Sequence, residues 1–147
     1  MQHQASVAYQ TQQIMTAPPV RLVAMLYERA LRALRDAIRA IDAGEVQTRF
    51  ENVERASEIV VHLAGTLDTE RGGEVAANLS RLYVFMLRRL SDVNLRNDAQ
   101  AARDVIGLLE PLAESWRELA RTASGGGASA APPATVTAAP RGIAVSA

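Results

Sequence analysis

Residues 16–44 read TAPPVRLVAMLYERALRALRDAIRAIDAG, and apolar side chains recur in this stretch every three or four residues. The recurring apolar residues are Val23, Leu26, Ala30, Leu34, Ala37 and Ile41, and the opposite face carries Glu28, Arg32, Arg35, Arg39 and Asp42. This spacing is typical of a long amphipathic helix. Thr16 can cap its first turn, prolines are tolerated directly after such a cap, and Gly44 suits a left-handed stop. The stretch therefore predicts a helix over residues 17–43.

Three further amphipathic patterns follow, and each predicts a helix. The second is expected from about Glu45 to the glycines of DTERGGE, with an apolar face of Phe50, Val53, Ala56, Val60, Leu63 and Leu67. The third is expected from near Glu74, with Val75, Leu79, Leu82, Met86, Leu90 and Val93. The fourth is expected over residues 98–121, with Ala102, Val105, Leu109, Leu112, Trp116 and Leu119 turned inward. Together they predict an all-α fold, an antiparallel up-down four-helix bundle over residues 17–121.

One residue disturbs the fourth pattern. Pro111 cannot donate a hydrogen bond to the carbonyl of Gly107, and its ring crowds that carbonyl, so a kink is expected there. Gly107 itself relieves part of the clash. The alternative is a helix that is broken into two pieces at this point.

The two ends of the chain differ from the helical region. Residues 1–16 are mainly polar but carry four larger apolar side chains, which are Val7, Tyr9, Ile14 and Met15. This is more apolar anchoring than a free tail needs, so the segment is expected to pack on the bundle. Residues 122–147 are rich in Ala, Gly, Pro and Ser. Such a composition buries too little apolar area to offset the entropy of ordering, which predicts a disordered tail.

Composition excludes several classes of function. Arginine supplies all 16 basic residues, and 16 acidic residues balance them to a net charge of zero. This balance argues against a nucleic-acid partner, because phosphates select a basic surface. The chain has no cysteine, and no cofactor or metal is expected. No apolar run approaches the roughly 20 residues that cross a bilayer, and the first residues lack a signal pattern, so a cytoplasmic protein without a membrane span is predicted.

The two histidines, His3 and His62, are too few for the paired ligand motifs of a di-iron bundle. His62 lies inside the second helical pattern, as in histidine phosphotransfer modules, which are also four-helix bundles. Those modules place a Lys and small residues after the His, whereas HLAGTL at 62–67 offers Gly65 but no cation. No nucleophile with an adjacent base can be assembled. A non-enzymatic binding function is expected, with phosphotransfer through His62 as an alternative.

Apolar residues outside the core stripes predict a partner site. Phe85 falls on the polar face of the third pattern, and Leu22 and Met25 flank the stripe of the first. Tyr27 extends that stripe, and Tyr83 is a fifth candidate contact, although a place in the core or at its edge is favoured for it. A wide apolar surface on a small bundle often forms a groove for an amphipathic segment. The alternatives are that these residues widen the core, or that the surface pairs with itself in a self-associating bundle.

A polar stretch, NLRNDAQAARDV at residues 94–105, separates the third and fourth patterns. Asn97 is expected to cap the new helix, Gln100 to complete a capping box, and Asp98 to meet the positive end of the helix dipole. Two more residues of the stretch are candidate contacts, Asn94 and Arg96.

Several stretches, taken together and in order, resemble the flagellar secretion chaperone FliS family. They are AYQ at 8–10, TAPPVRLVAMLYERAL from Thr16, LDTERGGEVAANLSRLY from Leu67, MLRRLSDVNLRNDAQA from Met86 and LLEPLAESWREL from Leu108. The likeness spans about residues 7–120. Pro111 departs from the regular helix that is usual in the family at this point, and the tail extends beyond the family's usual end.

The resemblance implies a non-enzymatic export chaperone with a helical-bundle fold. Its client would be the disordered C-terminal segment of flagellin, which it would cover to prevent premature polymerisation and deliver to the flagellar type III secretion system. The N-terminal segment would act as a removable cover over part of the client's surface. The flagellar export gate is a further candidate partner, and a weak homodimer is another.

Overall fold

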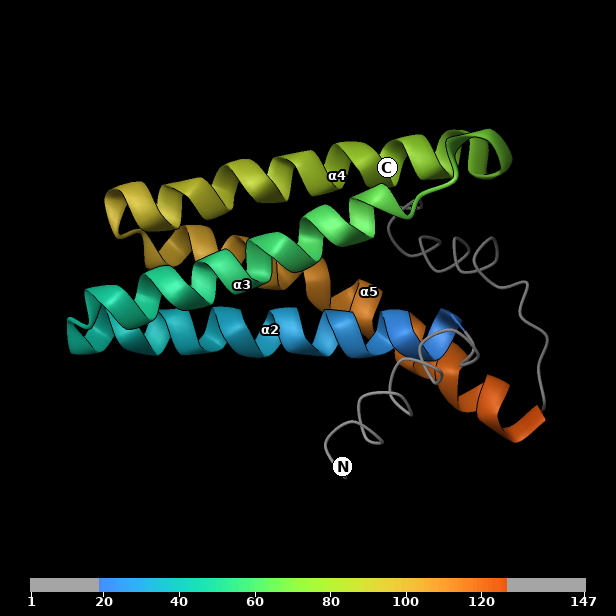
Figure 1. The fold of residues 1–147 in the computed structure, drawn as a ribbon, viewed down its shortest axis with the longest axis horizontal. Helices are drawn as coiled ribbons and strands as arrows, with labels where there is room; N and C mark the ends of the chain where they lie inside the picture. Colours follow the sequence, from blue (N-terminus) through green and yellow to red (C-terminus); the bar gives the residue numbers. More distant parts are fainter. Residues whose placement is uncertain (1–18, 127–147) are drawn as a thin grey trace, which may run out of the picture.

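The computed structural model describes residues 19–126 of the 147-residue chain, and these form four helices (Figure 1). The helices are α2 (Pro19–Ala43), α3 (Val46–Gly65), α4 (Thr69–Arg96) and α5 (Ala99–Gly126). No strand occurs in this part of the chain, which confirms the all-α prediction. The expectations for Val7, Tyr9, Ile14, Met15 and Thr16, and for most of the C-terminal tail, lie outside the described residues.

The helices run up and down in turn, and connections of two or three residues join them. Each helix therefore lies antiparallel to the next, and α5 returns beside α2 to close the ring (Figure 1). The neighbouring pairs are α2 with α3, α3 with α4, α4 with α5 and α5 with α2, so α2 and α4 stand on one diagonal. This arrangement is the predicted antiparallel four-helix bundle.

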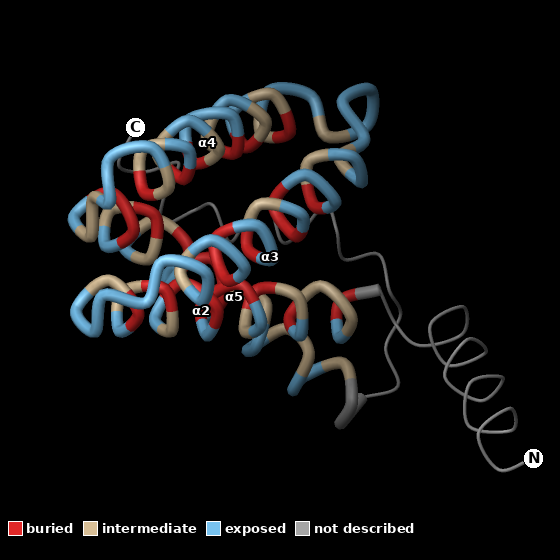
Figure 2. Tube along the Cα trace, turned by 60° about the vertical axis from the view of Figure 1, so that its left-hand side comes forward, coloured by how far each residue is buried: buried red, intermediate tan, exposed pale blue. Residues whose placement is uncertain are grey.

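The buried side of each helix faces the bundle axis (Figure 2). The largest fully buried side chains come from all four helices and are Tyr27, Leu34, Met86, Leu90, Leu109 and Leu112, with Val53, Val60, Val93 and Val105. Almost all of the predicted apolar stripes contribute to this core. Leu119 is only partly buried and is not among the residues that pack against the core, and the Phe50 side chain is 43% exposed. Phe50 lies about 100° around α3 from the centre of the buried face formed by Val53, Ala56, Val60 and Leu63.

The ends of the helices agree in part with the sequence-based expectations. Gly44 takes the expected left-handed conformation, with φ of 71°, directly after α2. A short helical turn precedes the expected start at Glu74, because the Asp68 carboxylate accepts the backbone N–H groups of Glu70 and Arg71 and starts α4 at Thr69. Gly73, with φ of 53° and ψ of −131°, then interrupts the helical backbone. Gly73 therefore separates a short first turn from the long helix that begins at Glu74, where the sequence predicted its start.

The fourth helix differs from the prediction at its end and in its middle. It continues to Gly126, five residues beyond the expected end at 121, so the predicted tail begins too early. Pro111 lies within an uninterrupted α5, and the alternative of two separate helices is wrong. Leu109 and Leu112, on the two sides of Pro111, are buried in the core, and this tertiary packing outweighs the local cost of a proline.

The expected role of Asn97 as an N-cap is also wrong. Asn97 ends α4 in a left-handed conformation with φ of 56°, which asparagine tolerates better than most residues. The cap of α5 is instead Asp98, whose Oδ1 accepts the backbone N–H of Ala101 at 3.1 Å. Gln100 does not complete a capping box, because its side-chain amide donates to Asp104 at 2.9 Å. The capping position is therefore one residue later than expected.

Candidate binding surfaces

Two of the candidate contact residues are in the core. Tyr27 is 1% exposed and Tyr83 is 3% exposed, so neither side chain offers a surface to a partner. Their hydroxyl groups form a buried hydrogen bond with each other. Tyr27 also stacks on Trp116, with ring centroids 6.4 Å apart. The assignment of these two tyrosines as client contacts is corrected to a structural role, because the hydroxyl of each satisfies the other inside the bundle.

Burial governs the ionisation of this tyrosine pair. It raises the pKa of Tyr27 well above its ordinary value, and the facing Tyr83 raises that pKa further. Burial raises the pKa of Tyr83 as well. Both tyrosines are therefore neutral over the physiological pH range, and the pair remains a hydrogen bond between two uncharged hydroxyl groups.

Polar contacts tie α3 to α4 at the end of the bundle where α4 connects to α5. The Arg49 guanidinium donates to the side-chain oxygen of Asn94 at 3.3 Å, to its backbone carbonyl at 3.3 Å, and to the side-chain oxygen of Asn97 at 2.8 Å. Asn94 and Asn97 thus hold an arginine of the neighbouring helix. Arg96 is exposed. One feature of the sequence could have indicated this contact. Arg49 lies one helical turn before Val53, at the N-terminal end of the apolar stripe of α3.

A second arginine ties α4 to α5 at the same end. Arg89 donates to Asp92 at 2.9 Å and to Asp104 at 2.6 Å, and Asp98 lies 4.0 Å away. The hydrogen bond to Asp104 raises the pKa of Arg89. Hydrogen bonds from Gln100 and then from Arg89 lower the pKa of Asp104. The NLRND stretch therefore lies between two arginine clusters that join three helices, which gives it a structural role.

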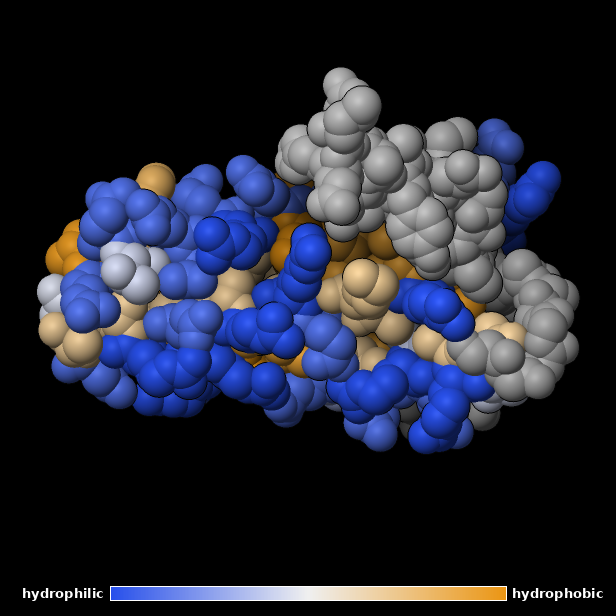
Figure 3. All heavy atoms as spheres, turned by 60° about the horizontal axis from the view of Figure 1, so that its bottom comes forward, coloured by the Kyte–Doolittle hydropathy of each residue, from blue (hydrophilic) through white to orange (hydrophobic). Residues whose placement is uncertain are grey.

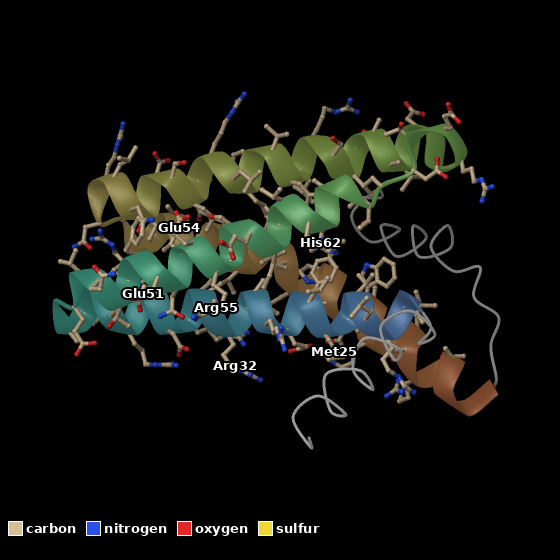
Figure 4. All side chains as sticks on the ribbon, viewed as in Figure 1. Met25, Arg32, Glu51, Glu54, Arg55 and His62 are labelled. Carbon is tan, nitrogen blue, oxygen red and sulfur yellow. The ribbon has the colours of Figure 1, made fainter. Side chains whose placement is uncertain are left out.

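The remaining candidates lie on two different faces. The α2–α3 face is identified by a shallow depression of about 290 Å³, lined by Arg29, Arg32, Ala33, Asp36, Asn52 and Arg55. Met25 lies one helical turn before Arg29 and is 49% exposed, and Leu22 lies one turn earlier and is partly exposed. In Figure 4, Met25, Arg32, Arg55 and His62 lie along α2 and α3. This face therefore combines apolar side chains with three arginines.

Phe85 belongs to the opposite face. It lies one turn before Arg89, whose side chain binds Asp104 of α5, so Phe85 lies on the α4–α5 face. Its side chain is 47% exposed. Since α2 and α4 stand on a diagonal of the bundle, the structure does not bring Met25 and Phe85 together. The prediction of exposed apolar side chains is confirmed for both residues. Figure 3 shows one side of the molecule, where hydrophobic residues reach the surface between hydrophilic ones.

A third set of exposed apolar residues was not singled out from the sequence. Phe50 and Val61 on α3, and Val84 and Leu95 on α4, are large apolar side chains that are exposed to solvent. Phe50 had been placed in the core, and the other three had no assigned role. The sequence could have predicted that Val84 and Leu95 are exposed, because both lie on a different side of α4 from the core residues Met86 and Leu90.

The described residues contain neither a cluster of potential metal ligands nor a helix that could cross a membrane. No group of three or more potential ligands among His, Cys, Asp and Glu lies close enough within residues 19–126 to hold a metal ion. None of the four described helices is long and apolar enough to cross a membrane. His62 is exposed on α3. The fold and its surfaces thus define a four-helix bundle with exposed apolar faces, as partner-binding bundles have.

Comparison with known proteins identifies the family. The family described as "Flagellar protein FliS" matches residues 1–123. The flagellar secretion chaperone FliS of Salmonella typhimurium is 44% identical over 112 residues, which cover 76% of this chain and 83% of that protein. The chain belongs to the FliS family of flagellar secretion chaperones.

Two more distant relatives carry the same description. The flagellar secretion chaperone FliS of Campylobacter jejuni is 39% identical over 112 residues, which cover 76% of this chain and 88% of that protein. The FliS of Bacillus subtilis is 32% identical over 111 residues, which cover 76% of this chain and 82% of that protein. The similarity therefore extends over most of each relative.

Proposed function

We propose that this protein binds the disordered C-terminal segment of flagellin in the cytoplasm, prevents its premature polymerisation, and supports its export by the flagellar type III secretion system. It acts as a non-enzymatic chaperone. Membership of the FliS family supports the export role. The observation that carries the binding role is the presence of half-exposed apolar side chains, Met25 and Phe85, on a bundle whose core is formed by other side chains of the four helices.

The distance between these side chains indicates that the client is a long segment. Met25 and Leu22 are on the α2–α3 face, whereas Phe85 is on the α4–α5 face, so one compact ligand does not reach both. A long segment without structure of its own can contact both faces by passing around the bundle. Such a segment loses conformational entropy on binding, and several separate apolar contacts are needed to leave net affinity.

The N-terminal segment has a proposed role in the same process. Val7, Tyr9, Ile14 and Met15 would cover part of the client's surface in the free chaperone and leave it when flagellin binds. Deletion of residues 1–15 should then speed client association if the segment only competes with the client. Stopped-flow association with a flagellin C-terminal peptide measures this rate, and a loss of binding would show instead that the segment also contacts the client. The flagellar export gate is a further candidate partner of the loaded complex.

Co-purification tests the proposed function as a whole. The tagged full-length chain should retain full-length flagellin from its own cells, and it should not retain a flagellin that lacks its C-terminal segment. Equal retention of both forms would overturn the proposal. Incubation with acetyl phosphate tests the phosphotransfer alternative, because a phosphohistidine at His62 is acid-labile and would be lost in a His62→Gln variant.

A further inference from the structure

Two shallow depressions adjoin each other on the α2–α3 face. The first, of about 290 Å³, is the one lined by three arginines. The second, of about 590 Å³, shares Asp36 and Asn52 with the first and extends along both helices to the turn at Gly44. Its other lining residues are Arg39, Ala40, Asp42, Ala43, Glu45 and Thr48. The two depressions form one continuous surface, called here the α2–α3 groove.

The first half of the groove is positively charged. Arg29, Arg32 and Arg55 line it, and the one carboxylate among them, that of Asp36, forms an ion pair with Arg39. None of the three arginines forms an ion pair within residues 19–126, and all three are exposed. Their guanidinium groups are therefore available to donate charge-assisted hydrogen bonds to the carboxylates of a partner.

A buried amide holds one of these arginines in place. Asn52 is 7% exposed and is the one buried polar residue of the described part of the chain. Its side-chain nitrogen donates to the carbonyl of Thr48 at 2.9 Å, and its side-chain oxygen accepts from Arg55 at 3.1 Å. Because Arg55 is already oriented in the free protein, it loses less conformational entropy when a ligand binds.

The second half of the groove has the opposite charge. Asp42 and Glu45 line it, and neither forms an ion pair within the four helices and their connections. The one cation there, Arg39, is paired with Asp36. Met25 lies beyond the other end of the groove, one turn before the arginines, and is half-exposed (Figure 4). The face is thus apolar, then positive, then negative along α2.

We propose that the α2–α3 groove binds one stretch of the flagellin client in a fixed direction. An apolar side chain of the client lies on Met25, a carboxylate on the arginines, and a cation at Asp42 and Glu45. This inference rests on the proposed function and adds which client residues are selected. Arg32 is about 10 Å and Asp42 about 25 Å along α2 from Met25. In an extended client, the acidic residue therefore follows the apolar one by about three positions and the basic one by about eight.

The charge pattern favours a peptide over other anions. A phosphate ion would lie near the carboxylate of Asp36 and, in a shallow groove, would stay in contact with water, which weakens its attraction to the arginines. A nucleic acid would continue past the arginines to Asp42 and Glu45, which repel it. A peptide that carries both signs of charge matches both halves of the groove, and the reverse direction would bring like charges together.

Isothermal titration calorimetry with a flagellin C-terminal peptide tests the role of the arginines. Arg29→Gln and Arg32→Gln should each raise the dissociation constant about threefold, and the double variant about tenfold. An increase in salt from about 50 mM to about 500 mM should weaken binding to the wild type more than to the double variant. Arg103→Gln is the matched control, because Arg103 is an exposed arginine of α5 that lies outside the groove.

Charge exchange tests the direction of the client. Each acidic residue of the peptide is replaced in turn by lysine, and one such peptide should restore binding to an Arg32→Glu variant. A peptide in which a basic residue is replaced by glutamate should likewise restore binding to an Asp42→Lys variant. The two rescuing positions should lie about five residues apart in an extended client. Rescue of both variants at one position would contradict the fixed direction.

The remaining outcomes separate this inference from the proposed function. If the wild type binds the flagellin peptide and the Arg29→Gln/Arg32→Gln variant binds it equally well, the inference is wrong and the proposed function stands. An equal loss in Arg103→Gln would also overturn it, because the attraction would then be general. A wild type that does not bind the peptide contradicts the proposed function itself. A labelled oligoglutamate peptide tests the arginines apart from flagellin, and equal binding to the wild type and the double variant would exclude them as carboxylate contacts.

Discussion

The hydroxyl groups of Tyr27 and Tyr83 form a buried hydrogen bond between α2 and α4, which stand on a diagonal of the bundle. Adjacent helices of the bundle are joined by apolar packing and by ion pairs, such as the one between Arg35 and Glu110 at 2.6 Å. The tyrosine pair instead crosses the core. It requires a specific alignment of α2 and α4, because the Tyr83 hydroxyl without Tyr27 would be a buried polar group without a partner.

Removal of both hydroxyls should cost less stability than the two single removals added together. Tyr27→Phe should lower the free energy of unfolding by about 1–3 kcal/mol, because it leaves the buried Tyr83 hydroxyl unpaired. Tyr83→Phe should cost less, because the Tyr27 hydroxyl keeps a side-chain hydrogen bond with Trp116. The double variant should lose less than the sum of the single variants. Urea denaturation of the four proteins measures this cycle. If the losses of the two single variants add up to the loss of the double variant, the hydrogen bond between the two hydroxyls does not contribute to stability.

The same pair should make the protein sensitive to alkaline pH. Because the folded pKa values of both tyrosines are raised, their contribution is fully present below the unfolded pKa of about 10 and is lost as the pH rises above it. The free energy of unfolding, measured by urea denaturation between pH 8 and 11, should therefore fall at the upper end of this range. The variant with both tyrosines replaced by Phe should show a smaller fall.

Asp104 should contribute to acid sensitivity. Its folded pKa is lowered by hydrogen bonds from Gln100 and Arg89, so its contribution is present above the unfolded pKa of about 4 and is lost as the pH falls through the folded value. Asp104→Asn should reduce stability near neutral pH and should flatten the acid side of the stability profile. Thermal unfolding between pH 2 and 7 measures both effects. Asp42→Asn, an exposed substitution near the end of α2, is the control, and an equal change in both variants would contradict the prediction.

The kink in α4 should require glycine at position 73. The backbone of Gly73, with φ of 53° and ψ of −131°, is strained for a residue with a side chain, so Gly73→Ala should destabilise the protein by about 1–3 kcal/mol. Gly107→Ala is the control, because Gly107 lies in α5 and an added Cβ there meets nothing within 4 Å. That variant should be stabilised by about 0.5–1 kcal/mol. Calorimetric unfolding compares the two, and a destabilised Gly107→Ala variant would show that Pro111 needs a glycine at this position.

Truncation of the exposed apolar residues should weaken client binding. Leu22→Ala, Met25→Ala and Phe85→Ala should each reduce the affinity for a flagellin C-terminal peptide by about 1–3 kcal/mol where the side chain fills a pocket in the complex. Isothermal titration calorimetry measures the loss. Val46→Ala is the control, since Val46 is also exposed but lies at the start of α3. Unchanged binding in the three variants would remove these residues from the client site.

Much of the fold could be predicted from the sequence, because helix formation here depends on local patterns. The apolar repeat of residues 17–43 and its stop at Gly44 depend on neighbours within a few positions, and the structure places the helix at Pro19–Ala43. The short connections then leave an antiparallel bundle as the arrangement that buries all four apolar stripes. The family was recognisable as well, since its motifs are contiguous stretches of sequence.

The sequence by itself therefore determined the four helices, their up-down order and the family, because these depend on periodicity and on contiguous motifs. Tertiary structure alone decided which residues meet. Tyr27 and Tyr83 are 56 positions apart, and their hydroxyls pair only once α2 and α4 face each other across the core. Asn97 ends α4, and the next residue, Asp98, caps α5. Phe50 faces solvent because the buried face of α3 lies on another side of the helix. Such contacts depend on how the helices are rotated and aligned against one another, and the pattern of any one helix does not contain that information.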